Sequence, residues 1–225
     1  MILIACEESQ AVCIEMRAIG LEAYSCDMQE CSGGHPEWHI MGDVIPLLNG
    51  FCRFQTMDGV WHELDYRWEM IIAHPPCTFL TKAGACRLYK QAGKIDPVRM
   101  AEAVKARLFF QKFMDAQCEK ICIENPTPMK VVQLPPPTQV IQPYEFGHPY
   151  SKWTCLWIKG LPPLKPTEKC DRYTPFMPSN TGGLARGKGG SRGKAHDPKT
   201  ASVTFHGIAK AMADQWGGLL KEGKL

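Results

Sequence analysis

"MILIACEESQAVCIEMRAIGLEAYSCD", residues 1–27, decides the fold class. The short apolar run MILIAC is typical of a buried strand. Val12, Met16 and Ile19 then recur at helical spacing before a glycine that is expected to end the helix. A second apolar run, LEAYSC, ends at Asp27. Strand, helix and strand in this order predict the opening of a parallel sheet with helices on its faces.

The alternation continues along the chain. GDVIPLL predicts a short helical turn that begins at Asp43, and WEMIIAH and KICIEN are apolar runs typical of buried strands. Between them, the spacing predicts an amphipathic helix over 97–117. Its expected apolar face comprises Val104, Leu108, Phe109 and Phe113. We therefore expect an α/β protein with a Rossmann-like, doubly wound, mostly parallel sheet.

Two domains are expected. Residues 1–145 form the core, with a hairpin insertion at about 51–62 that turns at an Asp-Gly pair. After KICIEN, prolines dominate, and an extended loop is expected. Residues 146–225 form a small irregular C-terminal part with a late strand, KWTCLWIKGLPPL, and a basic glycine-rich loop at 182–194. The last segment, FHGIAKAMADQWGGLL, predicts a terminal helix that packs back on the core through Ile208, Met212 and Trp216.

Composition favours a soluble cytoplasmic protein. Apolar residues make up 44% of the 225 residues and charged residues 22%, and no apolar run is long enough to span a bilayer. The amino terminus lacks the basic segment of a signal peptide. Eleven scattered cysteines, an odd number without any CxxC pair, are expected to be mostly buried reduced thiols. We expect a monomer.

A metal site is the weaker interpretation of one cluster. Cys31, His35 and His39 are spaced by four residues, but Gly33, Gly34 and Pro36 interrupt any helix there, and no fourth ligand is evident. These residues are expected to belong to a structural loop, and no metal is expected.

Polar segments follow four of the predicted strands: ACEESQ, CDMQE, HPPCT and ENP. In doubly wound folds, ligands bind beyond the carboxyl ends of the strands. Asp27 could bind ribose hydroxyls there, and Asp43 could accept from an adenine amino group. Taken singly, each segment could equally be a turn or a helix start, with Ser9 as a cap. Their recurrence at four strand ends favours a ligand site.

HPPCT together with IENP resembles motifs IV and VI of the DNA cytosine C5-methyltransferases. The short phage and prophage members of that family are the best match, because ACEES, GGHPEWHI, GDV and IAKAMADQW follow in the same order. The resemblance implies the class I fold of S-adenosylmethionine-dependent methyltransferases. It implies the activity of a DNA (cytosine-5-)-methyltransferase, with S-adenosylmethionine as cofactor and DNA as partner.

The resemblance also assigns roles. Cys77, held by the prolines before it, would attack C6 of cytosine, and Glu124 would bind or protonate N3. Asn125 would support the loop. The cofactor would be bound by Cys6, Glu7, Glu8, Ser9, Asp27, Met28, Asp43, Val44 and Pro75. The alternative for Cys77 is a buried structural thiol.

Some features depart from the family pattern. The first loop, ACEESQ, has Gln10 where a glycine is expected, and Glu7 and Glu8 make it acidic. One of these acids could bind the α-amino group of the cofactor, and a modified cofactor remains open. The family's arginine-rich motif is absent, and Lys152 is the basic residue in its place, as a candidate contact to cytosine O2. A related one-carbon transfer, modification of a free nucleotide, or an inactive DNA-binding homologue are the alternatives.

DNA contact is expected at the basic loop. Residues 182–194, GGLARGKGGSRGK, contain six glycines, four basic residues and no acid. The four basic residues are Arg186, Lys188, Arg192 and Lys194. They could track phosphates, because lysine and arginine supply most of the salt-dependent affinity for DNA. A solvated linker is the equally weighted alternative.

Overall fold

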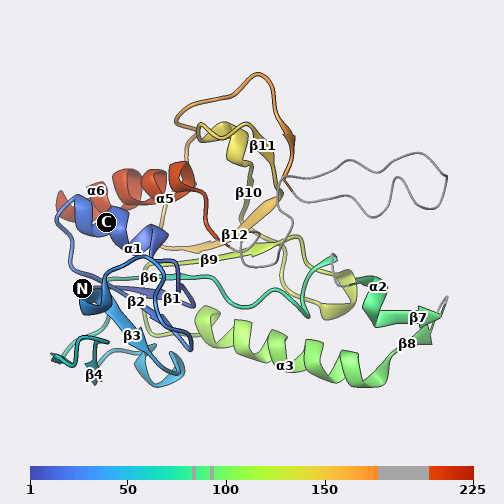
Figure 1. Ribbon diagram of the computed structural model, residues 1–225, viewed down its shortest axis with the longest axis horizontal. Helices are drawn as coiled ribbons and strands as arrows, with labels where there is room; N and C mark the ends of the chain where they lie inside the picture. Colours follow the sequence, from blue (N-terminus) through green and yellow to red (C-terminus); the bar gives the residue numbers. More distant parts are fainter. Residues whose placement is uncertain (83–84, 92–93, 177–202) are drawn as a thin grey trace.

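The computed structural model describes the chain except residues 83–84, 92–93 and 177–202. A seven-stranded sheet with the order β10-β12-β9-β6-β1-β2-β3 runs through the molecule (Figure 1). Its strands are β1 (Ile2–Ala5), β2 (Ala23–Asp27), β3 (His39–Met41), β6 (Met70–Ala73), β9 (Ile121–Pro126), β10 (Gln139–Ile141) and β12 (Thr154–Lys159).

Five neighbouring strands, from β3 through β2, β1 and β6 to β9, are parallel, and β12 pairs antiparallel with both β9 and β10. The prediction of a Rossmann-like, doubly wound, mostly parallel α/β sheet is confirmed. One part of the sheet was not expected. The proline-rich segment after β9 contributes β10, because β12 presents an edge whose backbone groups need partners.

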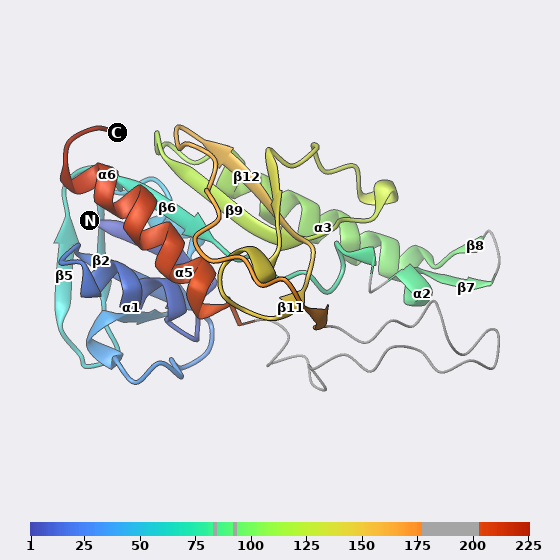
Figure 2. The same ribbon diagram turned by 90° about the horizontal axis from the view of Figure 1, so that it is seen from above.

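Helices cover both faces of the sheet (Figures 1 and 2). Side chains of β1 alternate between the two cores: Ile2 and Ile4 pack with α1, α5 and the turns that follow, and Leu3 packs on the side of α3. The helices of these layers are α1 (Ala11–Ala18), α3 (Pro97–Met114), α5 (His206–Met212) and α6 (Gly218–Lys221), with a π-helical turn, Ala213–Gly217, between the last two. Parallel strands buried on both faces explain the continuous apolar runs in the sequence.

The predicted helix at 97–117 is α3, but its buried face differs from the expected one. Ala103, Phe110 and Phe113 are buried, whereas Leu108 is 55% exposed. Residues 103, 110 and 113 follow helical spacing toward the sheet, and Leu108 lies outside that stripe. Asp96 caps the start of the helix, because its carboxylate accepts from the backbone amides of Val98 and Arg99.

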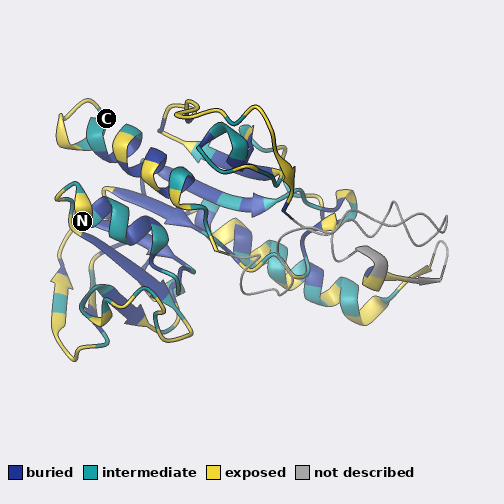
Figure 3. Cartoon of the chain, turned by 45° about the horizontal axis from the view of Figure 1, so that its top comes forward, coloured by how far each residue is buried: buried dark blue, intermediate teal, exposed yellow. Residues whose placement is uncertain are grey.

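The hairpin prediction is confirmed by β4 (Cys52–Gln55) and β5 (Trp61–Leu64), which pair antiparallel. Gly59 in its turn has a φ of +88°, a conformation that favours glycine. Phe54 packs edge-on against Tyr24 of β2, with ring centroids 5.0 Å apart. The sheet is largely buried and much of the hairpin is exposed (Figure 3).

Several short elements complete the described part of the chain. They are the helix α2 (Ala85–Leu88), the strands β7 (Tyr89–Gln91), β8 (Lys94–Ile95), β11 (Tyr150–Ser151) and β13 (Thr174–Pro175), and the 3-10 turns η1 (Pro36–Trp38), η2 (Ile45–Leu47), η4 (Lys130–Val132) and η5 (Pro143–Glu145). The turn η2 confirms the helical turn predicted at Asp43, whose Oδ1 accepts from Ile45 N at 3.0 Å.

The predicted terminal helix is confirmed as α5, the π-helical turn and α6. Ile208, Met212 and Trp216 are all buried, and Trp216 Nε1 donates to Pro162 O at 2.8 Å. Ten of the eleven cysteines have a described side chain; all ten are free thiols, and five of them are buried. No helix among the described residues has both the length and the apolar character needed to cross a bilayer.

Candidate active site

Charged side chains of alternating sign occupy one edge of the sheet. The strands β1, β6, β9 and β12 are neighbours in that order. Glu7 follows β1, His74 follows β6, Glu124 lies near the end of β9, and Lys152 precedes the antiparallel β12. The charges of Glu7, Glu124 and Lys152 all act on His74. Four adjacent strand ends therefore carry an acid, a base, an acid and a base.

His74 and Glu124 form the centre of this row. His74 Nδ1 lies 3.3 Å from Glu124 Oε2, and their side chains are only 9% and 12% exposed. Burial lowers the pKa of His74, but the hydrogen bond to Glu124 and the negative charges of Glu7 and Glu124 outweigh it and raise that pKa. Burial raises the pKa of Glu124, and the contact with His74 and the charge of Lys152 reverse this and lower it. The raised pKa of His74 and the lowered pKa of Glu124 both favour an ion pair between the two side chains.

Cys77 lies in the loop that follows His74. Its carbonyl accepts from the amides of Leu80 and Thr81, at 3.0 and 3.2 Å, which closes a turn directly after the cysteine. Asn125 Nδ2 donates to Pro75 O at 2.7 Å and ties the loop to β9. Burial raises the pKa of the half-buried Cys77 thiol, the charge of Glu124 raises it further, and Lys152 acts in the opposite direction. The thiol is consequently protonated at neutral pH in this state.

The first loop is closed by its own side chains. Glu7 is buried, and its two carboxylate oxygens accept from Val12 N at 2.7 Å and Cys13 N at 3.2 Å, so it caps α1. Burial raises the pKa of Glu7. Gln10 is fully buried with a φ of +59°, and its side chain bonds to Ser25 Oγ and to the backbone of His35. Glu7, rather than Ser9, is therefore the cap of α1.

The remaining acid of this loop is directed elsewhere. Glu8 accepts a short hydrogen bond from Ser32 Oγ. Gly33 lies so close to the loop that an added Cβ would come within 2.7 Å of Ser9 O and 2.6 Å of Gln10 Cβ. The loop and the segment around Gly33 are thus packed as one unit at the end of β1.

Two acids converge on Cys6, which follows β1. Burial raises the pKa of the Cys6 thiol, and the charges of Asp27 and Asp43 raise it further, so both carboxylates lie within electrostatic reach. Asp27 Oδ1 accepts from Gln29 N at 3.0 Å, in a local turn after β2. Beside them Met28 is 73% exposed and Val44 is buried. Carboxylates that still have acceptor capacity, next to apolar surface, fit the hydroxyl and amino groups of a nucleoside.

The two histidines of the segment considered for metal binding are engaged with other protein groups. His39 Nδ1 lies 2.8 Å from Ser25 Oγ and Nε2 lies 2.9 Å from Gln29 O, so both ring nitrogens are occupied. His35 stacks on Trp38 with ring centroids 3.7 Å apart. Across the described ranges, no group of three or more His, Cys, Asp or Glu residues has the arrangement of a metal site.

Residues 177–202 lie outside the described part of the chain, and so do the predicted DNA contacts Arg186, Lys188, Arg192 and Lys194. The residues that flank this segment are described. Phe176 and Phe205 pack edge-on with ring centroids 4.6 Å apart, and Thr204 Oγ1 lies 3.5 Å from His74 Nδ1. Lys152 Nζ lies 5.8 Å from the Phe205 ring. The two ends of the segment therefore meet beside the His74–Glu124 pair.

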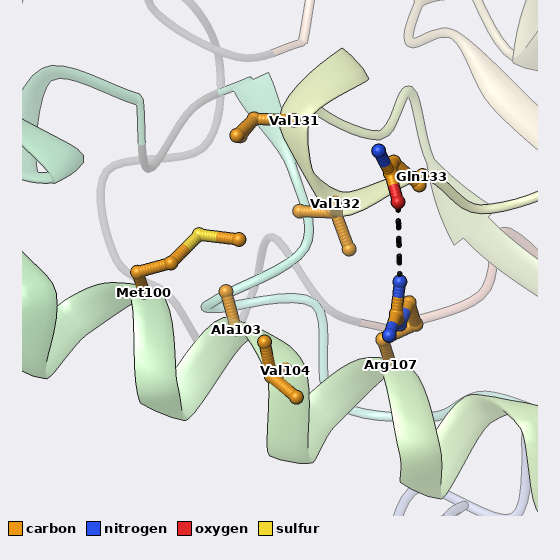
Figure 4. A pocket seen from close by; sticks show the side chains of 7 residues that line it. All are labelled: Met100, Ala103, Val104, Arg107, Val131, Val132 and Gln133. Carbon is orange, nitrogen blue, oxygen red and sulfur yellow. Dashed lines mark hydrogen bonds between the residues drawn. The ribbon is translucent and has the colours of Figure 1, made fainter.

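A separate hollow of about 340 Å³ lies between α3 and η4 (Figure 4). It is lined by Met100, Ala103, Val104, Arg107, Val131, Val132 and Gln133. Arg107 Nη1 and Gln133 Oε1 lie 3.5 Å apart at its edge. None of these residues belongs to the candidate site.

Sequence reasoning missed His74 and the structural role of Gln10. His74 stands in the HPPCT segment itself, directly after an apolar strand. The sequence did contain a signal for His74, because a titratable side chain at a strand end is a candidate site residue when the neighbouring strand carries an acid such as Glu124. Gln10 gave no such signal, because its role depends on Ser25 and His35, which are distant in sequence.

Comparisons with known proteins add little. No protein-family model and no curated protein sequence matches the chain. Among solved structures, the chain is similar to a prophage-encoded E. coli protein described as a candidate DNA modification methyltransferase. The identity is 14% and the TM-score 0.43, over 76% of this chain and 52% of that one. The chain thus spans about half the length of that protein, and at this level the likeness decides nothing about the reaction.

Proposed function

We propose that the protein is a DNA methyltransferase that transfers a methyl group from S-adenosylmethionine to C5 of cytosine through a covalent bond between Cys77 and C6. The carrying observation is the arrangement of Cys77 and Glu124. The loop of Cys77 is tied by the 2.7 Å hydrogen bond between Asn125 and Pro75 to β9, the strand that also holds Glu124. A nucleophile and an acid on one rigid frame are what addition to a pyrimidine requires.

The residues act in sequence on the base. The Cys77 thiol gives its proton to solvent water, and the thiolate adds to C6 while the electrons of the C5–C6 double bond move into the ring. Protonated Glu124 gives a hydrogen bond or its proton to N3 and so neutralises the developing charge. C5, made electron-rich by the addition, would then be able to accept the methyl group that bound S-adenosylmethionine supplies. Loss of the C5 proton to water and expulsion of the Cys77 thiolate restore the aromatic ring and the enzyme.

The raised pKa of Cys77 is consistent with this order of events. While Glu124 is a carboxylate, its charge keeps Cys77 protonated. Protonation of Glu124 at the base removes that charge, so thiolate formation is coupled to substrate binding. Lys152 lowers the pKa of Cys77 and favours the same outcome. A free enzyme with a protonated thiol is also protected from oxidation.

The cofactor would be held at the ends of β1, β2 and β3. Asp27 and Asp43 fit the hydroxyl and amino groups of adenosine, with Cys6, Met28 and Val44 beside them and Pro75 at the neighbouring strand end. When bound, S-adenosylmethionine supplies an electrophilic methyl group. Glu7 does not fit the role of a direct ligand, since both of its oxygens are engaged with α1.

DNA is the proposed substrate. The target cytosine must leave the duplex to reach Cys77, or be offered on a single strand. The flanks of the segment that contains the basic loop meet beside His74. Arg186, Lys188, Arg192 and Lys194 are proposed to contact the phosphates around the extruded base.

The test uses DNA that contains 5-fluorocytosine with labelled S-adenosylmethionine. Fluorine at C5 cannot leave as a cation, so the Cys77–C6 bond is trapped after methyl transfer. Wild type is expected to form a labelled adduct that survives denaturation, and Cys77→Ser is expected to form none. Cys52→Ser in the distant hairpin is the matched control and should trap DNA like wild type. An adduct that persists in Cys77→Ser would overturn the proposed nucleophile.

One observation favours a second candidate, an inactive homologue that binds DNA. Glu7 occupies the amides at the start of α1, where nucleotide-binding folds often place an anionic ligand group. Such a protein would bind DNA without retaining S-adenosylmethionine in equilibrium dialysis and without transferring label. Transfer of label to free cytidine nucleotides, but not to DNA, would instead indicate a nucleotide-modifying enzyme.

A further inference from the structure

His74 is a buried histidine to which the proposed reaction assigns no role so far. Its imidazole is 9% exposed, and its hydrogen bonds run through Nδ1, 3.3 Å from Glu124 Oε2 and 3.5 Å from Thr204 Oγ1. His74 Nε2 is buried and has no hydrogen-bond partner among the described residues. The shorter hydrogen bond of the imidazole ring is therefore the one to Glu124, the acid proposed to act on N3 of the cytosine.

The surroundings of His74 favour a positive ring. Glu7 acts on it from the loop after β1 and Glu124 from β9. Lys152, ahead of β12, opposes them, and Thr204, ahead of α5, contributes a neutral hydroxyl. Two carboxylates and one ammonium group around the imidazole leave it with a net attraction for a proton.

Glu124 cannot supply the proton for N3 by itself. The proposed reaction needs Glu124 protonated when it meets N3, but the ion pair keeps Glu124 as a carboxylate in the free protein. A proton must therefore reach Glu124 during the reaction. His74 is the titratable neighbour in reach, since its Nδ1 lies 3.3 Å from Glu124 Oε2.

We propose that His74 is a positioning residue that stores the proton which Glu124 delivers to N3 of the target cytosine. As Cys77 Sγ bonds to C6, the proton on His74 Nδ1 moves to Glu124, and Glu124 gives a proton to N3. His74 becomes neutral. The cytosine gains one positive charge with the proton on N3, and this charge offsets the negative charge that the thiolate brought. When Cys77 leaves, N3 returns the proton through Glu124 to His74, and both carboxylate and imidazolium are restored.

The inference rests on the proposed function and has a distinct signature in the pH profile. The rate depends on the product of the Cys77 thiolate fraction, which rises tenfold per pH unit, and the protonated fraction of the pair. In wild type, the rate should rise until the pair loses its proton at the raised pKa of His74 and then level off. In His74→Gln, the proton is held by Glu124 alone, so levelling should begin at a lower pH, in the carboxyl range.

Single-turnover methyl transfer to DNA, measured from pH 5 to pH 9.5, tests this difference. Each pH unit by which the plateau starts earlier lowers the plateau rate tenfold, so His74→Gln should be at least about 10-fold slower than wild type at pH 8. The Kd for DNA should change by less than about threefold, since His74 acts through Glu124. The matched control is His206→Gln, which removes an exposed histidine from another His–Glu pair, 3.0 Å from Glu15, and should match wild type.

A second measurement does not depend on activity. The imidazole of His74 is titrated by NMR in wild type and in Glu124→Gln. The pKa of His74 should lie above its ordinary value of 6.5 in wild type and fall in the variant. An unchanged titration in Glu124→Gln would overturn the inference even where His74→Gln fails to fold.

The outcomes separate the two proposals. No methyl transfer by wild type at any pH would refute the proposed function. Transfer by wild type together with the same rate and the same levelling point in His74→Gln would refute only the role of His74.

Discussion

The side-chain amide of Asn125 donates a 2.7 Å hydrogen bond to the carbonyl oxygen of Pro75, across 50 positions of sequence. Asn125 is 1% exposed and lies on β9, whereas Pro75 begins the loop that carries Cys77. Adjacent residues of a strand face opposite sides of a sheet, so Glu124 and Asn125 act on different neighbours. One strand end thus provides an acid on one face and the anchor of the cysteine loop on the other.

Loss of this anchor should slow the reaction more than it destabilises the fold. Asn125→Ala removes a buried hydrogen bond and leaves Pro75 O unpaired, which is expected to cost about 1–3 kcal/mol of unfolding free energy. Misplacement of Cys77 is expected to lower the rate of adduct formation with 5-fluorocytosine DNA by about 10- to 100-fold. Asn49→Ala is the control, because Asn49 accepts from Gln117 N at 2.9 Å far from Cys77. Equal rates in the two variants would contradict the anchoring role.

The thiol of Cys77 should react slowly with alkylating agents in the free protein. Burial and the charge of Glu124 raise its pKa, so the thiolate fraction at pH 7.5 is smaller than for an ordinary cysteine. Glu124→Gln should accelerate alkylation by iodoacetamide at Cys77, and Lys152→Ala should slow it. Peptide mass spectrometry measures the rate at Cys77 and, as an internal control, at Cys170. A slower reaction in Glu124→Gln would contradict the electrostatic coupling.

The His74–Glu124 pair should give stability a defined pH window. The pKa of Glu124 is lowered from 4.5, so its contribution is present above that value and is lost as pH falls through the folded pKa. The pKa of His74 is raised from 6.5, so its contribution is complete below 6.5 and is lost as pH rises through the folded pKa. Between 4.5 and 6.5 both contributions are present.

Urea unfolding of wild type and His74→Gln measures this window. The difference in unfolding free energy should be about 2–4 kcal/mol near pH 5.5 and should shrink above the folded pKa of His74. His206→Gln should show a difference of less than about 1 kcal/mol, since that pair is at the surface. A difference that does not vary with pH would contradict the ion pair.

Two helical glycines should respond to alanine in opposite directions. A Cβ on Gly207 of α5 would lie 1.9 Å from Phe146 O, so Gly207→Ala must displace the helix or the loop and should destabilise the protein by about 1–3 kcal/mol. A Cβ on Gly218 meets nothing within 4 Å, so Gly218→Ala should stabilise it by about 0.5–1 kcal/mol. Thermal and urea unfolding report both changes. Destabilisation by Gly218→Ala would contradict the open space beside this residue.

Neutralisation of the basic loop should flatten the salt dependence of DNA binding. Replacing Arg186, Lys188, Arg192 and Lys194 by glutamine removes up to four phosphate contacts, which should lower the slope of log K against log salt by up to about 3–4. Fluorescence anisotropy between 50 and 300 mM salt gives the slope. A double substitution of exposed Lys105 and Lys210 is the control for net charge. An unchanged slope in the fourfold variant would leave the loop as a linker.

The sequence predicts the sheet where local pattern and burial agree. Strands β1, β2, β6 and β9 are buried on both faces, so their apolar runs are continuous and visible. Strand β10 is three residues long between prolines, and its pairing is determined by the distant β12. The buried face of α3 depends on how the helix is rotated about its axis against the sheet. The sequence does not determine this rotation, because apolar residues occur on two sides of the helix.

The candidate site was predictable only in part. Strand ends locate Cys77 and Glu124, because doubly wound folds gather their ligands there. The pairing of His74 with Glu124 requires β6 and β9 to be neighbours, which is a property of the strand order. The capping of α1 by Glu7 depends on a loop that begins and ends in the left-handed region, at Cys6 and Gln10, and neither residue signals this conformation.

The cap of α1 has one more consequence. A helix amino terminus carries a partial positive charge that nucleotide-binding folds commonly offer to a ligand. In this protein the carboxylate of Glu7 interacts with that partial charge, so the helix dipole stabilises the fold rather than a bound ligand. We therefore expect a small molecule at this edge of the sheet to bind through Asp27 and Asp43, the acids at the ends of β2 and β3. The site should therefore prefer ligands rich in hydroxyl and amino groups over ligands that bind through a phosphate group.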